Sequence, residues 1–395
     1  MKNTRRVLAI LLAATPAYFA ATQSALPRAA HKHFLALVGT YTTKTQSKGI
    51  YAFDFDADTG KLTAKGVAAE TPDPSWLAIS ADGRHVYSVN EAGKQSKVSA
   101  FSLDSNSGKL TALNQLASEG EDPCHISFDQ TGKTLLVANY TSGTVAAFPI
   151  LEDGKLGPHT SAQKDQGTLG PNKERQEGPH AHFIQADSRN RFVFVSDLGL
   201  DKVLIYEFDA AKGTLTSPAA PTAAQDGPDP FSVKVSPGTG PRHFVFSQDG
   251  KYLYVLGEIK STVTVFASDS QQVYRSIQEI SALLPDFHGH NDAAEIALHP
   301  NGKTLYTSNR GDDSIATFRV DEATGKLTFA GVTPTGGKEP RHFAIDPTGH
   351  YLLAENENSN SIVVFAIEQH DGGLARTTQM VSVPAPVNLQ FYPAK

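Results

Sequence analysis

Arginine, histidine and carboxylate residues stand at the two ends of one segment of this chain, residues 241–258. The segment begins with Arg242 and His243, carries a turn-forming Asp-Gly pair at 249–250, and ends on Glu258. A guanidinium binds anions, whereas an imidazole or a carboxylate can take a proton from water. If the segment folds as a β-hairpin, the turn brings its two ends together. We therefore expect acid–base and anion-binding groups to meet at the open end of this hairpin.

The elements that would position these groups follow from a repeat along the chain. From residue 34 onward, short runs of β-branched and aromatic residues alternate with Gly, Pro, Asp and Asn, which is typical of an all-β protein. Each repeat holds a strand, a turn with Gly or Asn, a second strand, and a more exposed strand after a small polar loop. Its period of roughly 50–60 residues matches a four-stranded propeller blade.

The two ends of the chain each hold part of one further repeat. Six repeats are complete, and residues 386–391 resemble a first strand without the strands that should follow it. Residues 36–41 and 49–53 resemble later strands without a first strand. Pairing the two ends completes a blade, so we predict an all-β, seven-bladed β-propeller over residues 34–395, closed by its N- and C-terminal strands, with no separable second domain. A β-sandwich is the alternative, but it does not explain the split repeat.

The propeller geometry selects the candidate site residues. The first strand of a blade lines the central channel, so the starts of first strands and the ends of second strands share one end of that channel. The polar residues at these places include Arg242, Arg310, Arg341, His180, His182, His243, His342, Glu258, Glu295, Asn139 and Asp197, together with His125, Asn388, Thr40, Asn90, Glu91, Asn309, Glu355 and Asn356. A histidine repeated in each blade can equally bind a neighbouring turn, and Glu258 can equally close a salt-bridge network with the arginines.

Other reactive groups give weaker signals. Cys124 is the only cysteine, which excludes an intramolecular disulfide and a zinc site built from cysteines. Cys124 and His125 are neighbours on a predicted strand, so we expect their side chains to point to opposite faces. His288, His290 and Asp292 could bind a metal ion, but a solvated loop is favoured there. We therefore predict no metal ion and no cofactor. The long connection 151–178 predicts a lid or rim around the site.

The bulk composition limits the partners and the location. The 395 residues include 19% charged and 39% hydrophobic residues and carry a formal net charge of −6, without a basic run that would favour nucleic acid. Residues 1–25 combine basic residues, a short apolar run and small residues, which is typical of a secretory signal peptide with an unclear cleavage site. An uncleaved anchor is the alternative. We predict a periplasmic or secreted protein, with no membrane association after cleavage.

Several motifs resemble those of a known family. Residues 170–182 (GPNKERQEGPHAH), 305–311 (LYTSNRG), 294–296 (AEI) and 39–41 (GTY) resemble the bacterial propeller lactonases, whose name-giving activity is 6-phosphogluconolactonase. The fungal carboxy-muconate cyclase is similar to these proteins. The resemblance extends from about residue 35 to residue 391 and implies a seven-bladed propeller. A signal peptide fits poorly with a phosphorylated cytoplasmic metabolite, so lactone hydrolysis is implied as a class rather than for one substrate.

The resemblance also implies roles for the candidate residues. By motif, the cyclase's active-site His, Arg and Glu correspond to His180 or His182, Arg242 and Glu258, and Arg310 corresponds to its second Arg. The predicted catalytic residues are therefore Glu258, His182, Arg242 and Arg310, and the predicted substrate-binding residues are His180, His243, Glu295, Arg341, His342, Asn139 and Asp197.

The resulting hypothesis is a metal-independent lactonase that binds a small anionic lactone or sugar acid. Glu258 or a channel histidine would activate water, and Arg242 and Arg310 would hold the anion and stabilise the oxyanion. Arg341 and His342 would extend the anion site. Two alternatives remain: a lactonising cyclase or isomerase acting on a dicarboxylate, and a periplasmic propeller that binds a ligand without catalysis.

Overall fold

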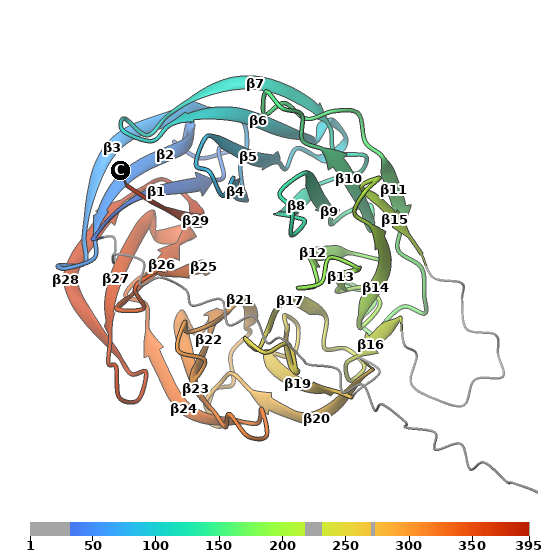
Figure 1. Ribbon diagram of the computed structural model, residues 1–395. Helices are drawn as coiled ribbons and strands as arrows, with labels where there is room; N and C mark the ends of the chain where they lie inside the picture. The colour runs from blue at the N-terminus through green and yellow to red at the C-terminus, as the bar shows by residue number, and fades with distance from the viewer. Residues whose placement is uncertain (1–31, 218–230, 270–272, 395) are drawn as a thin grey trace, which may run out of the picture. The chain divides into compact units, whose positions relative to one another are not determined.

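The strands of this protein form separate small sheets. The structure is a computed structural model that describes residues 32–217, 231–269 and 273–394. The predicted signal peptide, residues 1–25, lies outside these ranges. Within them the strands form seven antiparallel sheets, which Figure 1 shows arranged like blades around a common axis. This confirms the predicted all-β, seven-bladed β-propeller.

The first three blades, numbered along the chain, come from the N-terminal half. Their strands, from the axis outward, are β4 (Leu77–Ile79), β5 (His85–Asn90), β6 (Lys97–Asp104) and β7 (Lys109–Ala117) in blade 1; β8 (Pro123–Phe128), β9 (Thr134–Asn139), β10 (Thr144–Pro149) and β11 (Ser161–Lys164) in blade 2; and β12 (Ala181–Ala186), β13 (Phe192–Asp197), β14 (Lys202–Asp209) and β15 (Thr214–Thr216) in blade 3. A further strand, β16 (Ser232–Lys234), pairs with β14. A short 3₁₀ helix, η1 (Gly93–Gln95), precedes β6.

The remaining blades follow in chain order. Blade 4 contains β17 (Pro241–Phe246), β18 (Tyr252–Gly257), β19 (Thr262–Ser268) and β20 (Tyr274–Ser281); blade 5 contains β21 (Asp292–Leu298), β22 (Thr304–Arg310), β23 (Ser314–Val320) and β24 (Leu327–Pro334); blade 6 contains β25 (Pro340–Ile345), β26 (Tyr351–Asn356), β27 (Ser361–Ile367) and β28 (Leu374–Ser382). A second 3₁₀ helix, η2 (Glu357–Ser359), lies between β26 and β27. None of the helices among the described residues has the length and apolarity needed to cross a membrane.

Blade 7 joins the two ends of the described chain. It consists of β29 (Pro386–Pro393), β1 (His33–Thr40), β2 (Gly49–Asp56) and β3 (Lys61–Glu70). β29 pairs antiparallel with β1, with Phe391 opposite Ala36 and Leu389 opposite Val38. Because both strands also pack apolar side chains into one cluster, the pairing that closes the ring is part of the hydrophobic core. The predicted closure by N- and C-terminal strands is confirmed.

Buried tyrosines link neighbouring blades at the same point of the repeat. Tyr87 and Tyr306 are fully buried, and each hydroxyl donates to a backbone carbonyl in the next blade, at Gly154 (2.8 Å) and Gly372 (2.7 Å). The ring supplies apolar area while its hydroxyl avoids the cost of an unpaired buried donor. These contacts join blade 1 to blade 2 and blade 5 to blade 6.

A β-bulge near the start of most inner strands brings an additional side chain toward the axis. The register shifts between Pro123 and His125 in β8, and equivalent shifts occur in β12, β17, β21 and β25. A bulge places two residues opposite one, which breaks the strict alternation of faces. Cys124 and His125 therefore both contact the same inner strand, β12: Cys124 Sγ lies 3.8 Å from His182 Nδ1, and His125 Nδ1 accepts from the Ile184 backbone N–H at 3.3 Å. The expectation that they point to opposite faces is wrong.

Candidate active site

A buried carboxylate, Glu258, stands directly after β18 and gathers three guanidiniums from distant parts of the chain. Its carboxylate contacts Arg175 Nη2 and lies 3.0 Å from Arg242 Nε and 3.2 Å from Arg310 Nη2. Arg242 belongs to the bulge of β17, Arg310 ends β22, and Arg175 belongs to the loop before β12. We call Arg175, Arg242, Arg310 and Glu258 the arginine cluster. The hairpin 241–258 thus brings its two ends together as predicted.

The charge balance of the arginine cluster keeps Glu258 ionised. Burial alone would raise the pKa of Glu258, but the guanidiniums of Arg310 and Arg242 outweigh it and hold the pKa below its ordinary value. Burial lowers the pKa of Arg242 to about 10, with a further contribution from Arg310, so Arg242 remains charged at neutral pH. A carboxylate held by three cations is a weak base, and Glu258 is suited to orienting the arginines rather than to taking a proton.

Two of the arginines keep a buried N–H group without a hydrogen bond. Arg242 Nη1 donates to the carbonyl of Ala294, and Arg310 Nε donates to the carbonyl of Asp292 at 3.3 Å. Arg242 Nε and Arg310 Nη2, in contrast, make no hydrogen bond to any described residue, although both lie near Glu258 Oε2, because the donor geometry is poor. Buried donors are rarely left unpaired, so these two N–H groups are candidate donors to a ligand oxygen.

Arg175 was not among the predicted residues. The loop that carries it is held against blade 3, since Gln176 Nε2 donates to the Leu198 carbonyl (2.8 Å) and Gln176 Oε1 accepts from the Asn172 backbone N–H (3.0 Å). The Arg175 side chain is 34% exposed, more than the others of the cluster. The unusual length of the connection 151–178 predicts a rim around the site. The repeat does not extend into this connection, so it gives no reason to choose Arg175 over its neighbours.

His182 lies beside the cluster as a buried neutral base. It occupies the bulge of β12, and its ring lies 5.1 Å from that of His243. Burial lowers the pKa of His182 well below its ordinary value, Arg242 adds to the effect, and Glu258 opposes it. Its imidazole is therefore neutral near pH 7 and can accept a proton.

His180 is held at the rim by three contacts. Its ring stacks on that of Tyr140 at 4.5 Å, Nδ1 lies 3.1 Å from the Tyr140 carbonyl oxygen, and Nε2 lies 3.2 Å from a carboxylate oxygen of Glu177. Because a carbonyl only accepts, Nδ1 carries a proton and donates it. Both ring nitrogens of His180 are thus engaged within the protein.

His243 and Glu295 form a hydrogen-bonded series that ends on Arg242. Arg242 Nη1 lies 3.3 Å from His243 Nε2. A guanidinium can only donate, so Nε2 accepts and the ring proton sits on Nδ1, which donates to Glu295 Oε2 at 3.0 Å. Burial raises the pKa of Glu295 to about 8, so this carboxyl is largely protonated at neutral pH. The series orients Arg242 without adding a full negative charge.

His342, two blades further around the axis, also pairs with a buried carboxyl, here one of its own blade. Asn388 Oδ1 accepts from the Leu77 N–H (3.1 Å), which turns Nδ2 toward His342 Nε2 at 3.3 Å. His342 Nδ1 therefore carries the proton and donates to Glu355 Oε2 at 2.7 Å. The His342 ring also packs 5.3 Å from Trp76. Both predicted binding residues His243 and His342 thus lie in a buried layer.

Three further predicted binding residues form no hydrogen bond or ion pair with the arginine cluster, although Arg341 interacts electrostatically with Glu258 and Arg242. Arg341 packs over the Tyr41 ring at 5.1 Å and interacts electrostatically with Glu91 and Glu357. Asn139 Nδ2 donates to the Ser118 and Thr144 carbonyls at 3.0 and 3.3 Å, and Asp197 Oδ1 accepts the backbone N–H groups of His180 and Leu200, both at 2.9 Å.

Strand alternation explains the position of Asn139 and Asp197. They are the last residues of β9 and β13. Their side chains form hydrogen bonds with backbone groups of the adjoining loops instead of pointing to the axis. The residue that follows the second strand is the one that meets the axis, as Glu258 does after Gly257 and Tyr140 does after Asn139. The structure does not bring Asn139 and Asp197 to the cluster.

No group of three or more histidine, cysteine or carboxylate side chains that could hold a metal ion occurs among the described residues. Of the residues considered from the sequence, His290 Nε2 lies 3.9 Å from Asp292 Oδ2, and the other carboxylate oxygen of Asp292 lies 3.3 Å from Arg175 Nη1. Asp292 thus belongs to the surroundings of the arginine cluster.

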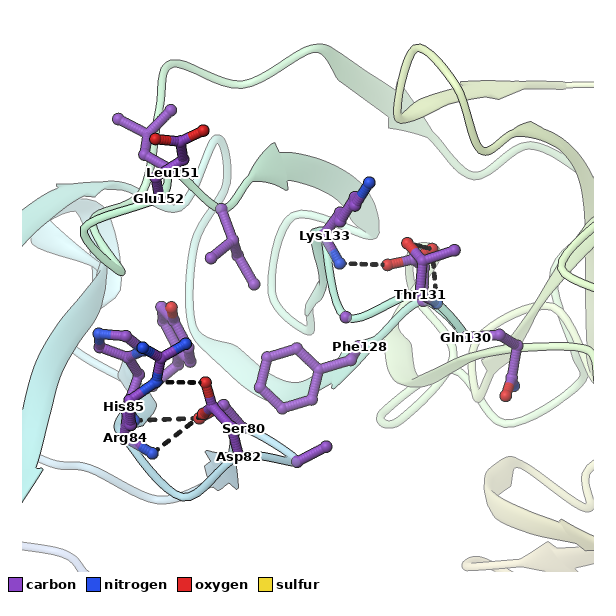
Figure 2. Close-up of a pocket in the computed structure, with 15 residues that line it drawn as sticks. Ser80, Asp82, Arg84, His85, Phe128, Gln130, Thr131, Lys133, Leu151 and Glu152 are labelled. Atoms are coloured by element: carbon purple, nitrogen blue, oxygen red, sulfur yellow. Dashed lines mark hydrogen bonds and ion pairs between the residues drawn. The ribbon is translucent and has the colours of Figure 1, made fainter.

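Two hollows lie at the other end of the strands, where the Gly turns are. A pocket of about 860 Å³ lies between blades 1 and 2 (Figure 2). Its polar groups serve their own turns: Asp82 accepts from Ser80 and Arg84, and Thr131 donates to Asp129. A second cavity, of about 660 Å³, is lined mainly by inner-strand side chains and extends to the buried layer of Glu295 and His342. Neither cavity is lined by the arginine cluster, whose buried unpaired donors make it the better candidate.

Comparison with known proteins gives one consistent result. A model of the family described as lactonase, 7-bladed beta-propeller, matches residues 35–391. A 6-phosphogluconolactonase of Bacillus subtilis is 36% identical over 91% of this chain and 98% of that protein, and one of Formosa agariphila is 34% identical over 78% of this chain and 85% of that protein. The solved structure of a Pseudomonas aeruginosa periplasmic gluconolactonase is similar with a TM-score of 0.84 and 33% identity, over 92% of this chain and all of that one.

Replacing Glu258 with glutamine should destabilise the fold. The substitution keeps the shape of the side chain but leaves three neighbouring guanidiniums without their shared anion. Breaking a buried charge network costs about 3–5 kcal/mol, measurable by urea unfolding. Glu207→Gln, at an exposed position of β14, is the matched control. A loss as small as that of the control would show that Glu258 does not hold the cluster together.

Proposed function

Since this chain belongs to the seven-bladed β-propeller lactonase family, we propose that it hydrolyses a sugar lactone at the arginine cluster. The observation that carries the assignment to this site is the pair of buried, unbonded N–H groups on Arg242 and Arg310. They suit a carbonyl oxygen that becomes negatively charged during the reaction. The similar proteins are named as lactonases, so the cyclase and the non-enzymatic alternatives are not favoured.

The arginines stabilise the transition state. The lactone carbonyl oxygen accepts from the N–H groups of Arg242 Nε and Arg310 Nη2, which lie 3.0 and 3.2 Å from Glu258 Oε2 but make no hydrogen bond to it. Attack of water on the carbonyl carbon places a negative charge on that oxygen. Both donors are already fixed, Arg242 by the Ala294 carbonyl and by His243, and Arg310 by the Asp292 carbonyl. Preorganised donors need no reorientation as the charge develops, which is the source of their effect on rate.

His182 is the general base of this proposal. It takes a proton from the attacking water, and the imidazolium then returns a proton to the ring oxygen as the carbon–oxygen bond breaks. The product is a hydroxy acid that ionises and releases a proton to solvent. Glu258 remains ionised throughout and holds the guanidiniums, while His243 and Glu295 act as positioning residues for Arg242.

We further propose that the protein acts in the periplasm or outside the cell. Two observations support this: the predicted signal peptide of residues 1–25, and the name of the Pseudomonas aeruginosa relative, a periplasmic gluconolactonase. Cell fractionation followed by N-terminal sequencing tests the location, and an intact N-terminus in the cytoplasmic fraction would contradict it.

Arg242→Ala should lower kcat for lactone hydrolysis by about 10²–10³-fold, because one oxyanion donor is lost. A pH-stat assay measures the rate after the spontaneous hydrolysis is subtracted, and thermal unfolding verifies that the variant is folded. Arg84→Ala removes an arginine that is 75% exposed on a distant turn, and it serves as the control. If the folded Arg242 variant hydrolyses lactones at nearly the normal rate, the proposed site is wrong.

His182→Gln should lower kcat/KM by about 10²–10⁴-fold. In the unchanged protein the base works only when neutral, and its pKa lies below 6.5 because the ring is buried near Arg242. The rate should therefore stay level as the pH falls from 7.5 through 6.5 and decline only at more acidic pH. A decline centred at or above pH 6.5 would argue against His182 as the base.

A further inference from the structure

Two carboxylates on the solvent side of the cluster already neutralise its outer arginines. Asp292 Oδ1 lies 3.3 Å from Arg175 Nη1, and Glu339 Oε1 lies 3.9 Å from Arg310 Nη1. Their side chains are 21% and 33% exposed, whereas that of Glu258 is 5% exposed. A molecule that approaches from solvent therefore meets Asp292 and Glu339, together with the 34% exposed Arg175, before it reaches the buried guanidiniums of Arg242 and Arg310.

The charges around the cluster leave no surplus for a permanent anion. The guanidiniums of Arg175, Arg242 and Arg310 face three carboxylates, those of Glu258, Asp292 and Glu339. The next arginine around the axis, Arg341, packs over Tyr41 and interacts electrostatically with Glu91 and Glu357, and also with Glu258 of the cluster. A phosphate dianion placed here would be repelled by these carboxylates and would have to displace one of them from its arginine.

An uncharged lactone fits the same groups better. Sugar hydroxyls can donate to the oxygens of Asp292 and Glu339, because an ionised carboxylate only accepts hydrogen bonds. The one charge of the reaction then appears in the transition state, on the oxygen between Arg242 and Arg310, where the unpaired N–H groups are. Interactions made only in the transition state raise kcat. Arg242 and Arg310 would therefore act on the charge that develops during the reaction, and an uncharged substrate needs no further cation at the entrance of the site.

We infer that the substrate is an uncharged sugar lactone, and that Asp292 and Glu339 are specificity-determining residues that disfavour phosphorylated lactones. This inference rests on the lactonase function proposed above. The reaction itself is ordinary hydrolysis: the water oxygen bonds to the carbonyl carbon, the ring carbon–oxygen bond breaks, and the new carboxylic acid loses its proton to solvent. The resulting carboxylate is an anion, and the outer carboxylates favour its departure.

The two carboxylates contribute unequally to this screen. Burial raises the pKa of Glu339, and Glu357 and Asp313 add to the effect, while Arg310 opposes it. Glu339 also contacts its arginine at the longer distance, 3.9 Å against 3.3 Å for Asp292. Asp292 is therefore expected to repel a phosphorylated lactone more strongly than Glu339 does. Because both contribute, the test must remove both charges.

The experiment compares glucono-δ-lactone with its 6-phosphate as substrates of the full chain after export. We expect kcat/KM to be at least about tenfold higher for the uncharged lactone. In an Asp292→Asn, Glu339→Gln double variant, the ratio should shift at least about fivefold toward the phosphorylated lactone, because two guanidiniums are freed. Glu322→Gln removes a carboxylate that is 65% exposed beside Lys303, away from the cluster, and should leave the ratio as it was.

The outcomes separate this inference from the function on which it rests. A native preference for the 6-phosphate, or a double variant with an unchanged ratio, would overturn the inference and leave the lactonase activity established. If the folded native protein hydrolyses neither lactone, the proposed function falls and the inference falls with it.

Discussion

The shared carboxylate of Glu258 is the constraint on which the rest of the site depends. Three guanidiniums, from a loop, an inner strand and the end of a second strand, lie close together only because one buried anion faces all of them. Burying such charges is costly, and a buried ion pair is weak evidence for stability. Its value here is geometric, since it holds cationic donors in place before any ligand arrives.

The propeller provides the rigid frame that such a cluster needs. Buried tyrosine hydroxyls join blade 1 to blade 2 and blade 5 to blade 6, and ring closure through β1 and β29 prevents the blades from spreading apart. The bulges then allow Arg242 and His243 to contribute side by side: one contacts Glu258, and the other fixes its neighbour through Glu295. The largely neutral His243 and Glu295 thus orient Arg242. They add no full charge that would weaken the ion pair between Arg242 and Glu258.

Much of this could be predicted from the sequence, for reasons that are specific to the repeat. The Asp-Gly turn at 249–250 fixes a hairpin, so the meeting of Arg242 with Glu258 follows from spacing alone. The split repeat at 36–41 and 386–391 likewise predicts the closing blade.

The rest depends on contacts that no repeat encodes. Arg175 reaches Glu258 from a loop without an equivalent in other blades, so only its loop's length gave a signal. Asn139 and Asp197 were assigned to the site because they end second strands, yet their side chains bond turns. The pairing of Cys124 with His182 depends on a bulge that spacing cannot reveal. Asp292 was considered only for a metal ion, whereas its partner is Arg175.

The most direct test of the central claim is a crystal structure with a lactam that mimics the lactone and cannot be hydrolysed in the crystal. If the arginine cluster is the oxyanion site, the lactam carbonyl oxygen accepts hydrogen bonds from Arg242 Nε and Arg310 Nη2 at about 2.7–3.2 Å, with the His182 imidazole facing the carbonyl carbon. A lactam bound at the other end of the channel, or one whose carbonyl contacts neither arginine, would contradict that claim.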